Sequence, residues 1–158
     1  GKWIIGKTVV DEEGKESFEV YGQAPAIASP KQLVLVIRKG KDDSDGLELI
    51  PMDNQKSNFG GGKYFLMNAT RVDIAGSIGT GKFSLKSNNH TLIAPQPTKT
   101  KGDSKYCYAQ IYFRKNEEIQ PFFTSTWRFS ENARTMVFFY HDPQTKHLKL
   151  HTIRDYVN

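Results

Sequence analysis

Tyrosines and an arginine alternate along one segment of the chain. Tyr106, Tyr108, Tyr112 and Arg114 occupy every second position, apart from Gln110 between them. Alternate side chains of a β-strand share one face of the sheet, so this spacing predicts an aromatic and cationic face. Rings and guanidinium groups on such a face stack on sugars or bases. We take the tyrosines and Arg114 as candidate ligand-binding residues; the alternative is a face covered by neighbouring side chains.

Two histidines flank a turn near the C-terminal end. If His141 and His147 face one another across a hairpin, their imidazoles could reach one zinc or copper ion. His151 lies four residues beyond His147, about 13 Å along a strand, which is too far to join them. Two ligands make a weak site, so no resident metal or other cofactor is expected, and pH sensitivity is the lesser alternative.

Two loops resemble ligand-binding motifs only in part. Residues 76–82 match the start of a phosphate-binding loop, but Phe83 replaces the required Ser or Thr and no helix follows. Residues 41–46 hold three carboxylates whose spacing misses that of calcium loops. We expect the glycines of the first to mark hairpin corners and the second to be a solvated turn.

No set of residues supports catalysis. The serines lack a recognisable nucleophile elbow, and no carboxylate pair is a matched acid and base. The single cysteine, Cys107, has no partner for an internal disulfide and falls on the apolar side of the alternating segment. We therefore expect a noncatalytic protein.

Composition describes an ordinary folded chain of moderate size. The 158 residues carry 22 basic and 17 acidic side chains, a net charge of +5, and the two signs are interleaved along the sequence. Scattered charge favours solubility over a nucleic-acid partner, which is not expected. The longest apolar run, residues 33–37, is closed by Arg38 and Lys39, so no membrane span is expected.

The elements that must position these residues are strands. No window repeats apolar residues at helical spacing, and Gly, Pro, Asn and Asp recur every eight to twelve residues, which is typical of short strands joined by turns. We expect strands at residues 3–10, 17–21, 33–37, 47–50, 64–67, 72–78, 83–85, 91–94, 106–114, 122–129, 134–141 and 148–153.

Two patterns predict where the core lies. Residues 33–37 are apolar on both faces, as in a strand at the centre of a fold. In the final hairpin we expect His141 to lie opposite His147. In this register residues 136, 138 and 140 share one apolar face with residues 148, 150 and 152. The expected core consists of Leu33, Leu35, Ile37, Ile111, Phe113, Phe138, Leu148 and Leu150.

These elements predict one all-β domain over residues 1–158. The expected architecture is a two-sheet antiparallel sandwich of immunoglobulin-like type. An eight-stranded lipocalin-like barrel is the alternative.

Three segments support a resemblance that covers residues 60 to 155. They are Tyr64-Phe65-Leu66-Met67-Asn68-Ala69-Thr70; Gly76 and Gly79 with Phe83-Ser84-Leu85-Lys86; and Met136-Val137-Phe138-Phe139-Tyr140-His141-Asp142-Pro143. These segments resemble uncharacterised exported bacterial proteins with β-sandwich folds. The resemblance implies an immunoglobulin-like sandwich in the cell envelope, and it implies no activity.

The first residues suggest a second resemblance. Gly1-Lys2-Trp3 is similar to the Gly-x-Trp start of lipocalin barrels, whose length also fits. The sequence begins without Met, so we expect that either a tag or an upstream segment has been removed, and a signal peptide fits the second alternative.

These patterns together predict a noncatalytic binding or interaction module of the bacterial cell envelope, periplasmic or extracellular. Its expected partner is a protein or glycan that the sequence does not identify. The alternative is a lipocalin-like carrier of a small apolar ligand.

Overall fold

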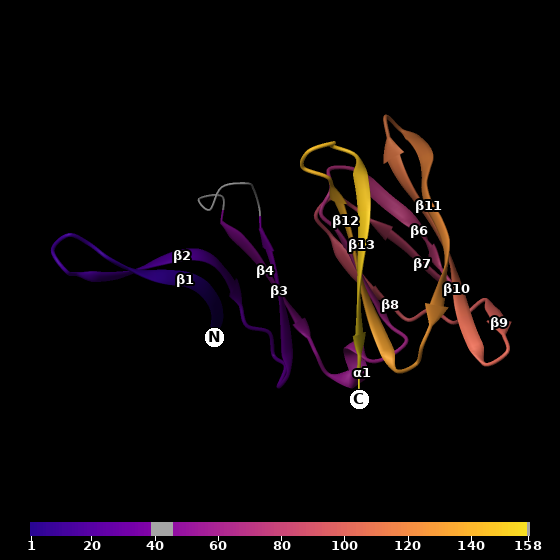
Figure 1. The fold of residues 1–158 in the computed structure, drawn as a ribbon, viewed down its shortest axis with the longest axis horizontal. Helices are drawn as coiled ribbons and strands as arrows, with labels where there is room; N and C mark the ends of the chain where they lie inside the picture. The colour runs from indigo at the N-terminus through magenta and orange to yellow at the C-terminus, as the bar shows by residue number, and fades with distance from the viewer. Residues whose placement is uncertain (39–45, 158) are drawn as a thin grey trace. The chain divides into compact units, whose positions relative to one another are not determined.

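The computed structural model describes residues 1–38 and 46–157, so residues 41–45 of the candidate calcium loop lie outside the described part. Strands make up 65% of the chain and helix 3%, which confirms the all-β prediction. Every expected strand overlaps an observed one, whereas β9 and α1 were not expected. The elements (Figure 1) are β1 (Lys2–Val10), β2 (Glu16–Pro25), β3 (Gln32–Arg38), β4 (Leu47–Asp53), α1 (Lys56–Phe59), β5 (Tyr64–Asn68), β6 (Asp73–Ile78), β7 (Gly81–Leu85), β8 (His90–Ile93), β9 (Lys99–Lys101), β10 (Ser104–Lys115), β11 (Glu118–Phe129), β12 (Ala133–His141) and β13 (Leu148–Tyr156).

The chain divides into two compact units, Gly1–Asn58 and Phe59–Asn158, where the sequence predicts a single domain. Among the described residues, β1 pairs with β2 and β3 pairs with β4, while β5 to β13 form two further sheets. Each unit therefore has its own strand pairing and is described by itself.

In the first unit, two-stranded sheets leave much apolar surface exposed. The β1–β2 register, with a bulge between Ile5 and Gly6, puts Ile4, Val10, Phe18 and Val20 on one face of the ribbon. These four side chains are between 50% and 62% exposed. A two-stranded ribbon cannot bury both of its faces by itself.

The strand expected at the centre of the fold is instead half of a two-stranded sheet. Residues 33–37 belong to β3, which pairs with β4 alone among the described strands. Leu33, Leu35 and Ile37 are only half-buried, and Val36 is 48% exposed. The prediction of a central strand here is wrong, because a run apolar on both faces also fits a sheet with two partly covered faces.

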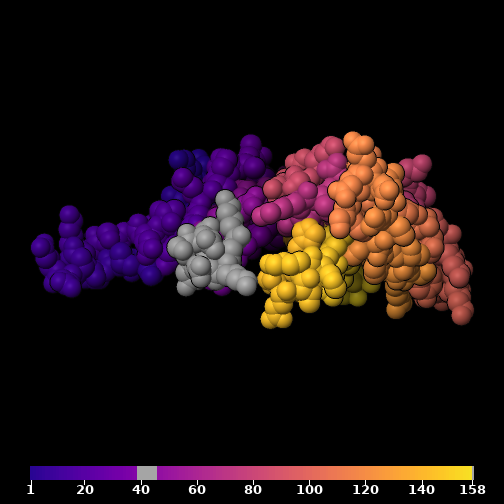
Figure 2. Space-filling model, turned by 90° about the horizontal axis from the view of Figure 1, so that it is seen from above, coloured from indigo at the N-terminus to yellow at the C-terminus, as the bar shows by residue number. Residues whose placement is uncertain are grey.

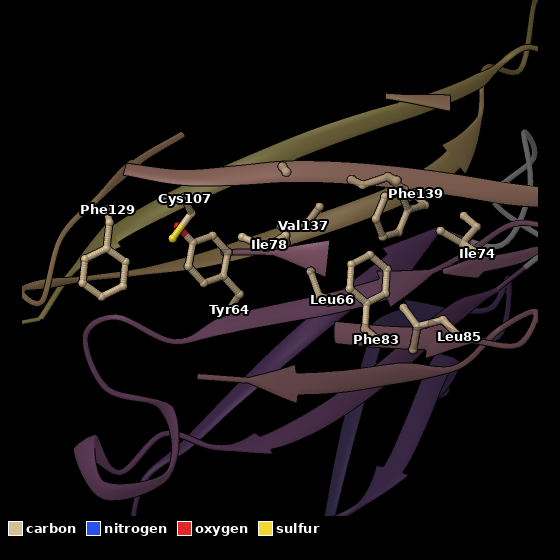
Figure 3. Packing of buried hydrophobic residues seen from close by; sticks show 12 residues of the cluster. Tyr64, Leu66, Ile74, Ile78, Phe83, Leu85, Cys107, Phe129, Val137 and Phe139 are labelled. Carbon is tan, nitrogen blue, oxygen red and sulfur yellow. The ribbon is translucent and has the colours of Figure 1, made fainter. Parts of the chain in front are cut away.

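The second unit is a sandwich of two sheets. One sheet has the order β11-β10-β6-β7, with β9 beside β10, and the other has the order β13-β12-β5-β8. Buried side chains from both sheets point toward one another and form one core (Figure 3), including Ile74, Ile78 and Phe83 from the first sheet and Leu66 and Phe139 from the second. This packing supports the sandwich prediction.

The central strand of the second unit is β5, and it differs from expectation in one pairing. All five residues of β5 are buried. It pairs antiparallel with β8 but parallel with β12, whereas the sequence predicts antiparallel strands throughout. A parallel pair needs a long connection between its strands, and here six strands separate β5 from β12 along the chain. Local turn signals cannot reveal such a pairing.

The final hairpin has a different register from the predicted one. His141 pairs with Leu148, and Tyr140 pairs with Lys149. The carboxylate of Asp142 accepts hydrogen bonds from the backbone N–H groups of Gln144 and Thr145, both 2.9 Å long, and this local turn sets the register.

The one-residue shift changes the predicted core. Val137 and Phe139 are fully buried, while Phe138 is only half-buried and lies outside the core cluster. Ile111 is buried as expected. Phe113, Leu148 and Leu150 pack against the cluster as partly buried residues.

A buried asparagine satisfies the backbone where β5 ends. Asn68 is fully buried, and its Nδ2 donates to the carbonyls of Val72 at 2.8 Å and Lys86 at 3.1 Å. Its Oδ1 accepts from the N–H of Thr70 at 3.0 Å and from its hydroxyl at 2.6 Å. Buried polar groups need such partners, so this side chain ties the end of β5 to the loop before β6 and to the end of β7.

Replacing Asn68 should destabilise the fold strongly. Asn68→Ala removes the four hydrogen bonds given above and leaves the buried N–H of Thr70 without its acceptor, and we expect a loss of about 2 to 4 kcal/mol in unfolding free energy. Asn89→Ala, at an exposed asparagine, is the matched control and should change stability by less than about 0.5 kcal/mol. Chemical denaturation measures both; equal stability of the two variants would contradict this account of the network.

Candidate binding surface

Strand β10 carries the alternating tyrosines in the interior of its sheet. It pairs with β11 on one side and β6 on the other. Cys107, Ala109 and Ile111 are buried in the core, as the alternation predicts. The opposite set faces outward, where Tyr108 is 44% exposed and Tyr106 and Tyr112 are half-buried.

Small side chains on the neighbouring strands lie beside Tyr108, Gln110 and Tyr112, whereas Tyr106 lies between Arg128 and Lys99. Thr126 on β11 lies opposite Tyr108, and Ala75 on β6 lies opposite Tyr112. Thr124 and Ser77 flank Gln110 in the same way. We call this surface the tyrosine face; it consists of Tyr106, Tyr108, Gln110, Tyr112 and Arg114 on β10 with Thr124, Thr126, Ala75 and Ser77 beside them.

The spacing of the rings follows from strand geometry. At about 3.4 Å per residue, Tyr106 and Tyr108 are roughly 7 Å apart along β10, and Tyr108 and Tyr112 roughly 14 Å. The row therefore extends over about 20 Å, a length that fits an extended chain better than a compact small molecule.

Charged groups lie at the Arg114 end of the tyrosine face. Asp73, opposite Arg114, forms a 2.6 Å ion pair with Lys86. The hydrogen bond from Lys86 lowers the pKa of Asp73, with the charge of Arg114 adding to the effect. A cavity of about 100 Å³ lies here, lined in part by Tyr112, Arg114 and Lys86. This end carries two cations and one anion.

A buried tyrosine beside the cysteine is absent from the sequence prediction. Tyr64 is 3% exposed, and its ring stacks on Trp127 with a centroid distance of 6.2 Å. Its hydroxyl lies beside the Cys107 sulfur (Figure 3), and burial raises the pKa of Tyr64 to about 12. Burial also raises the pKa of the Cys107 thiol, which keeps it protonated and poorly nucleophilic at neutral pH.

The two candidate metal-binding histidines do not face one another. His141 pairs with Leu148, and the N–H of Asp142 donates to the carbonyl of His147. The predicted cross-strand pair is therefore wrong, for the register reason given above. Both histidines line one cavity of about 290 Å³ that is bordered by Phe113. No cluster of three or more His, Cys, Asp or Glu side chains suited to a metal ion occurs in residues 1–38 and 46–157.

The glycine-rich segment is the β6–β7 hairpin, as expected. Gly79 has a φ of 55°, and a Cβ there would lie 2.2 Å from the carbonyl oxygen of Gln96. The glycine thus permits a left-handed turn and close backbone approach. Strand β7 follows in place of the helix that a phosphate-binding loop requires.

No protein-family model and no curated protein matches the chain. Within the described residues, none of the helical structure is long and apolar enough for a transmembrane segment.

The buried phenol of Tyr64 should make stability depend on alkaline pH. Its pKa rises from 10.0 to about 12 on folding, so the neutral ring contributes stability in full below pH 10 and loses it as the pH rises toward 12. We expect ionisation of Tyr64 to lower the free energy of unfolding by roughly 2 to 3 kcal/mol as the pH rises through this interval.

Denaturation between pH 9 and pH 12 tests this assignment. Tyr64→Phe should have a shallower loss of stability in that interval than the unmodified chain. Tyr140→Phe, which changes an exposed ring, should behave like the unmodified chain. Identical profiles for all three proteins would show that Tyr64 makes no such contribution.

Proposed function

We propose that the protein is a noncatalytic binding module whose tyrosine face contacts a saccharide chain at the bacterial cell envelope. The periplasmic or extracellular location rests on the resemblance of residues 60 to 155 to exported bacterial β-sandwich proteins. The outward row of tyrosines on β10 is the observation that carries the binding role.

The neighbours of the tyrosines support an extended polar ligand. Thr124, Thr126 and Ser77 bring hydroxyl groups beside the rings, and each hydroxyl can donate and accept a hydrogen bond. Tyrosine combines an apolar ring with a polar end, which suits contact with a partner that is itself partly apolar and partly hydroxylated. A saccharide has that mixture of apolar ring faces and hydroxyl groups.

The space between the two sheets of the second unit is filled with side chains, which favours a binding site on the outer surface over one inside the fold. A carrier of a small apolar ligand, the alternative from the sequence, needs an apolar cavity. Between the two sheets lie fully or nearly fully buried side chains, including Leu66, Ile78, Phe83 and Phe139. We therefore place the proposed ligand on the surface of the sheet.

Replacing single tyrosines tests the proposed role. We expect Tyr108→Ala to weaken binding of an oligosaccharide about tenfold, because tyrosine is enriched among the interface residues whose truncation costs more than about 1 kcal/mol. Tyr140→Ala is the matched control, since Tyr140 is 37% exposed on the other sheet. Calorimetric titration with oligosaccharides released from bacterial envelopes measures both affinities.

Two results would contradict the proposal. One is equal affinity for Tyr108→Ala, Tyr140→Ala and the unmodified protein, with circular dichroism showing all three folded. The other is capture of a protein partner that requires Tyr108 while no envelope oligosaccharide binds, because this would assign the face to protein recognition.

A further inference from the structure

A groove lies between the edge strands of the two sheets in the second unit. Two cavities, of about 450 Å³ and 260 Å³, share Arg128 of β11 and Arg154 of β13 in their walls. The two strands lie side by side, orange and yellow in Figure 2, and the Arg154 guanidinium donates to the Arg128 carbonyl at 2.9 Å. The shared residues make the cavities neighbouring parts of one groove, with a size typical of ligand pockets.

Two arginines without a carboxylate partner line the groove. Lys105 and Glu131, which also line it, neutralise each other in a 2.6 Å ion pair. Among the described residues, neither Arg128 nor Arg154 forms an ion pair. Asp103 is the remaining charged residue of the lining, so the groove has an excess of one positive charge.

Two contacts orient the Arg154 side chain. Besides its bond to the Arg128 carbonyl, its guanidinium carbon lies 5.9 Å from the centre of the Tyr156 ring. A cation restrained by such contacts loses less side-chain entropy when it binds an anion. Guanidinium groups suit carboxylates in particular, whose two oxygens match the planar fork of donors.

The rest of the lining combines aromatic rings with hydroxyl groups. The stacked pair of Tyr64 and Trp127 lines the smaller cavity, and Thr126, Thr135 and Thr152 contribute hydroxyls to it. Ser104 and Ser130 line the larger cavity. The half-buried Trp127 ring and these hydroxyls, beside two arginines, fit a ligand that has both a sugar ring and an acidic group.

The groove is continuous with the tyrosine face. Arg128 lies directly opposite Tyr106 in the β10–β11 register, and Thr126 lies opposite Tyr108. Both β11 residues also line the groove. A chain that runs along the tyrosines toward Tyr106 therefore reaches the two arginines.

We propose that this groove binds the carboxylate of an acidic saccharide between Arg128 and Arg154. This inference rests on the proposed function and adds the class of sugar to it: a chain containing uronic acid or a similar carboxylate-bearing residue. The acidic residue occupies the groove, and the neighbouring residues of the chain lie along the tyrosine face.

Trp127 provides a reporter inside the groove. The chain has two tryptophans, so Trp3→Phe in the full chain leaves Trp127 as the only one. Titration with trigalacturonate should change Trp127 fluorescence in a saturable way. Cellotriose, a neutral trisaccharide, should bind at least tenfold more weakly, and inorganic phosphate at the same concentration should not compete.

Charge-removing variants in this background test the two arginines. Arg128→Gln and Arg154→Gln should each weaken trigalacturonate binding about tenfold or more, because a hydrogen bond to a charged group is lost. Arg71→Gln removes the same charge at an exposed residue outside the groove lining and should bind as the parent does. If Arg154→Gln does not fold, Arg128→Gln alone decides, since its side chain makes no bond within the described residues.

The possible failures are distinguishable. Equal binding of both trisaccharides, effective competition by phosphate, or normal affinity of Arg128→Gln overturns the acidic-sugar inference. If one of these results is found but Tyr108→Ala weakens the binding of both trisaccharides equally, the proposed function survives. If neither saccharide nor envelope oligosaccharides bind, both proposals fail.

Discussion

The complete burial of β5 is the constraint on which the second unit depends. Its five residues lie between β12 and β8 and are covered on both faces. A strand in that position needs every backbone and side-chain polar group satisfied. Asn68 achieves this at the end of the strand by bonding to the chain before β6 and after β7. The same residue thus connects the two sheets whose inner faces form the core.

The position of β10 follows from that core. Its inward residues Cys107 and Ala109 are small and fully buried, and the space above Cys107 is occupied by the Tyr64 ring. Because one face of β10 packs in the core, the alternation of side chains places Tyr106, Tyr108 and Tyr112 on the outer surface. The hydrophobic packing inside therefore determines which side chains a ligand can meet outside. On the adjacent β11, Trp127 lies opposite Cys107 on the inner side of the sheet and stacks on Tyr64.

Local patterns predicted the strands and the two faces of β10, because alternation and turn residues act over a few positions. Long-range features were not predictable in this way. The predicted register of the final hairpin differs from the observed one by one residue. Residues 136 and 138 are apolar, as are residues 137 and 139, so the sequence pattern fits either face. The hydrogen bonds of the Asp142 turn decide between the two registers. Residues 33–37 look like a central strand but belong to a two-stranded sheet. Arg128 and Arg154 are 26 residues apart and meet only because β11 and β13 are the edges of opposed sheets.

Hydroxyl-radical footprinting with and without trigalacturonate tests most directly whether the tyrosine face and the groove form one binding surface. Mass spectrometry of the oxidised side chains should show protection of Tyr108, Tyr112 and Trp127, while Tyr140 on the opposite sheet remains equally reactive. Protection confined to Tyr140 or to the first unit, or no protection at a saturating concentration, would contradict the account.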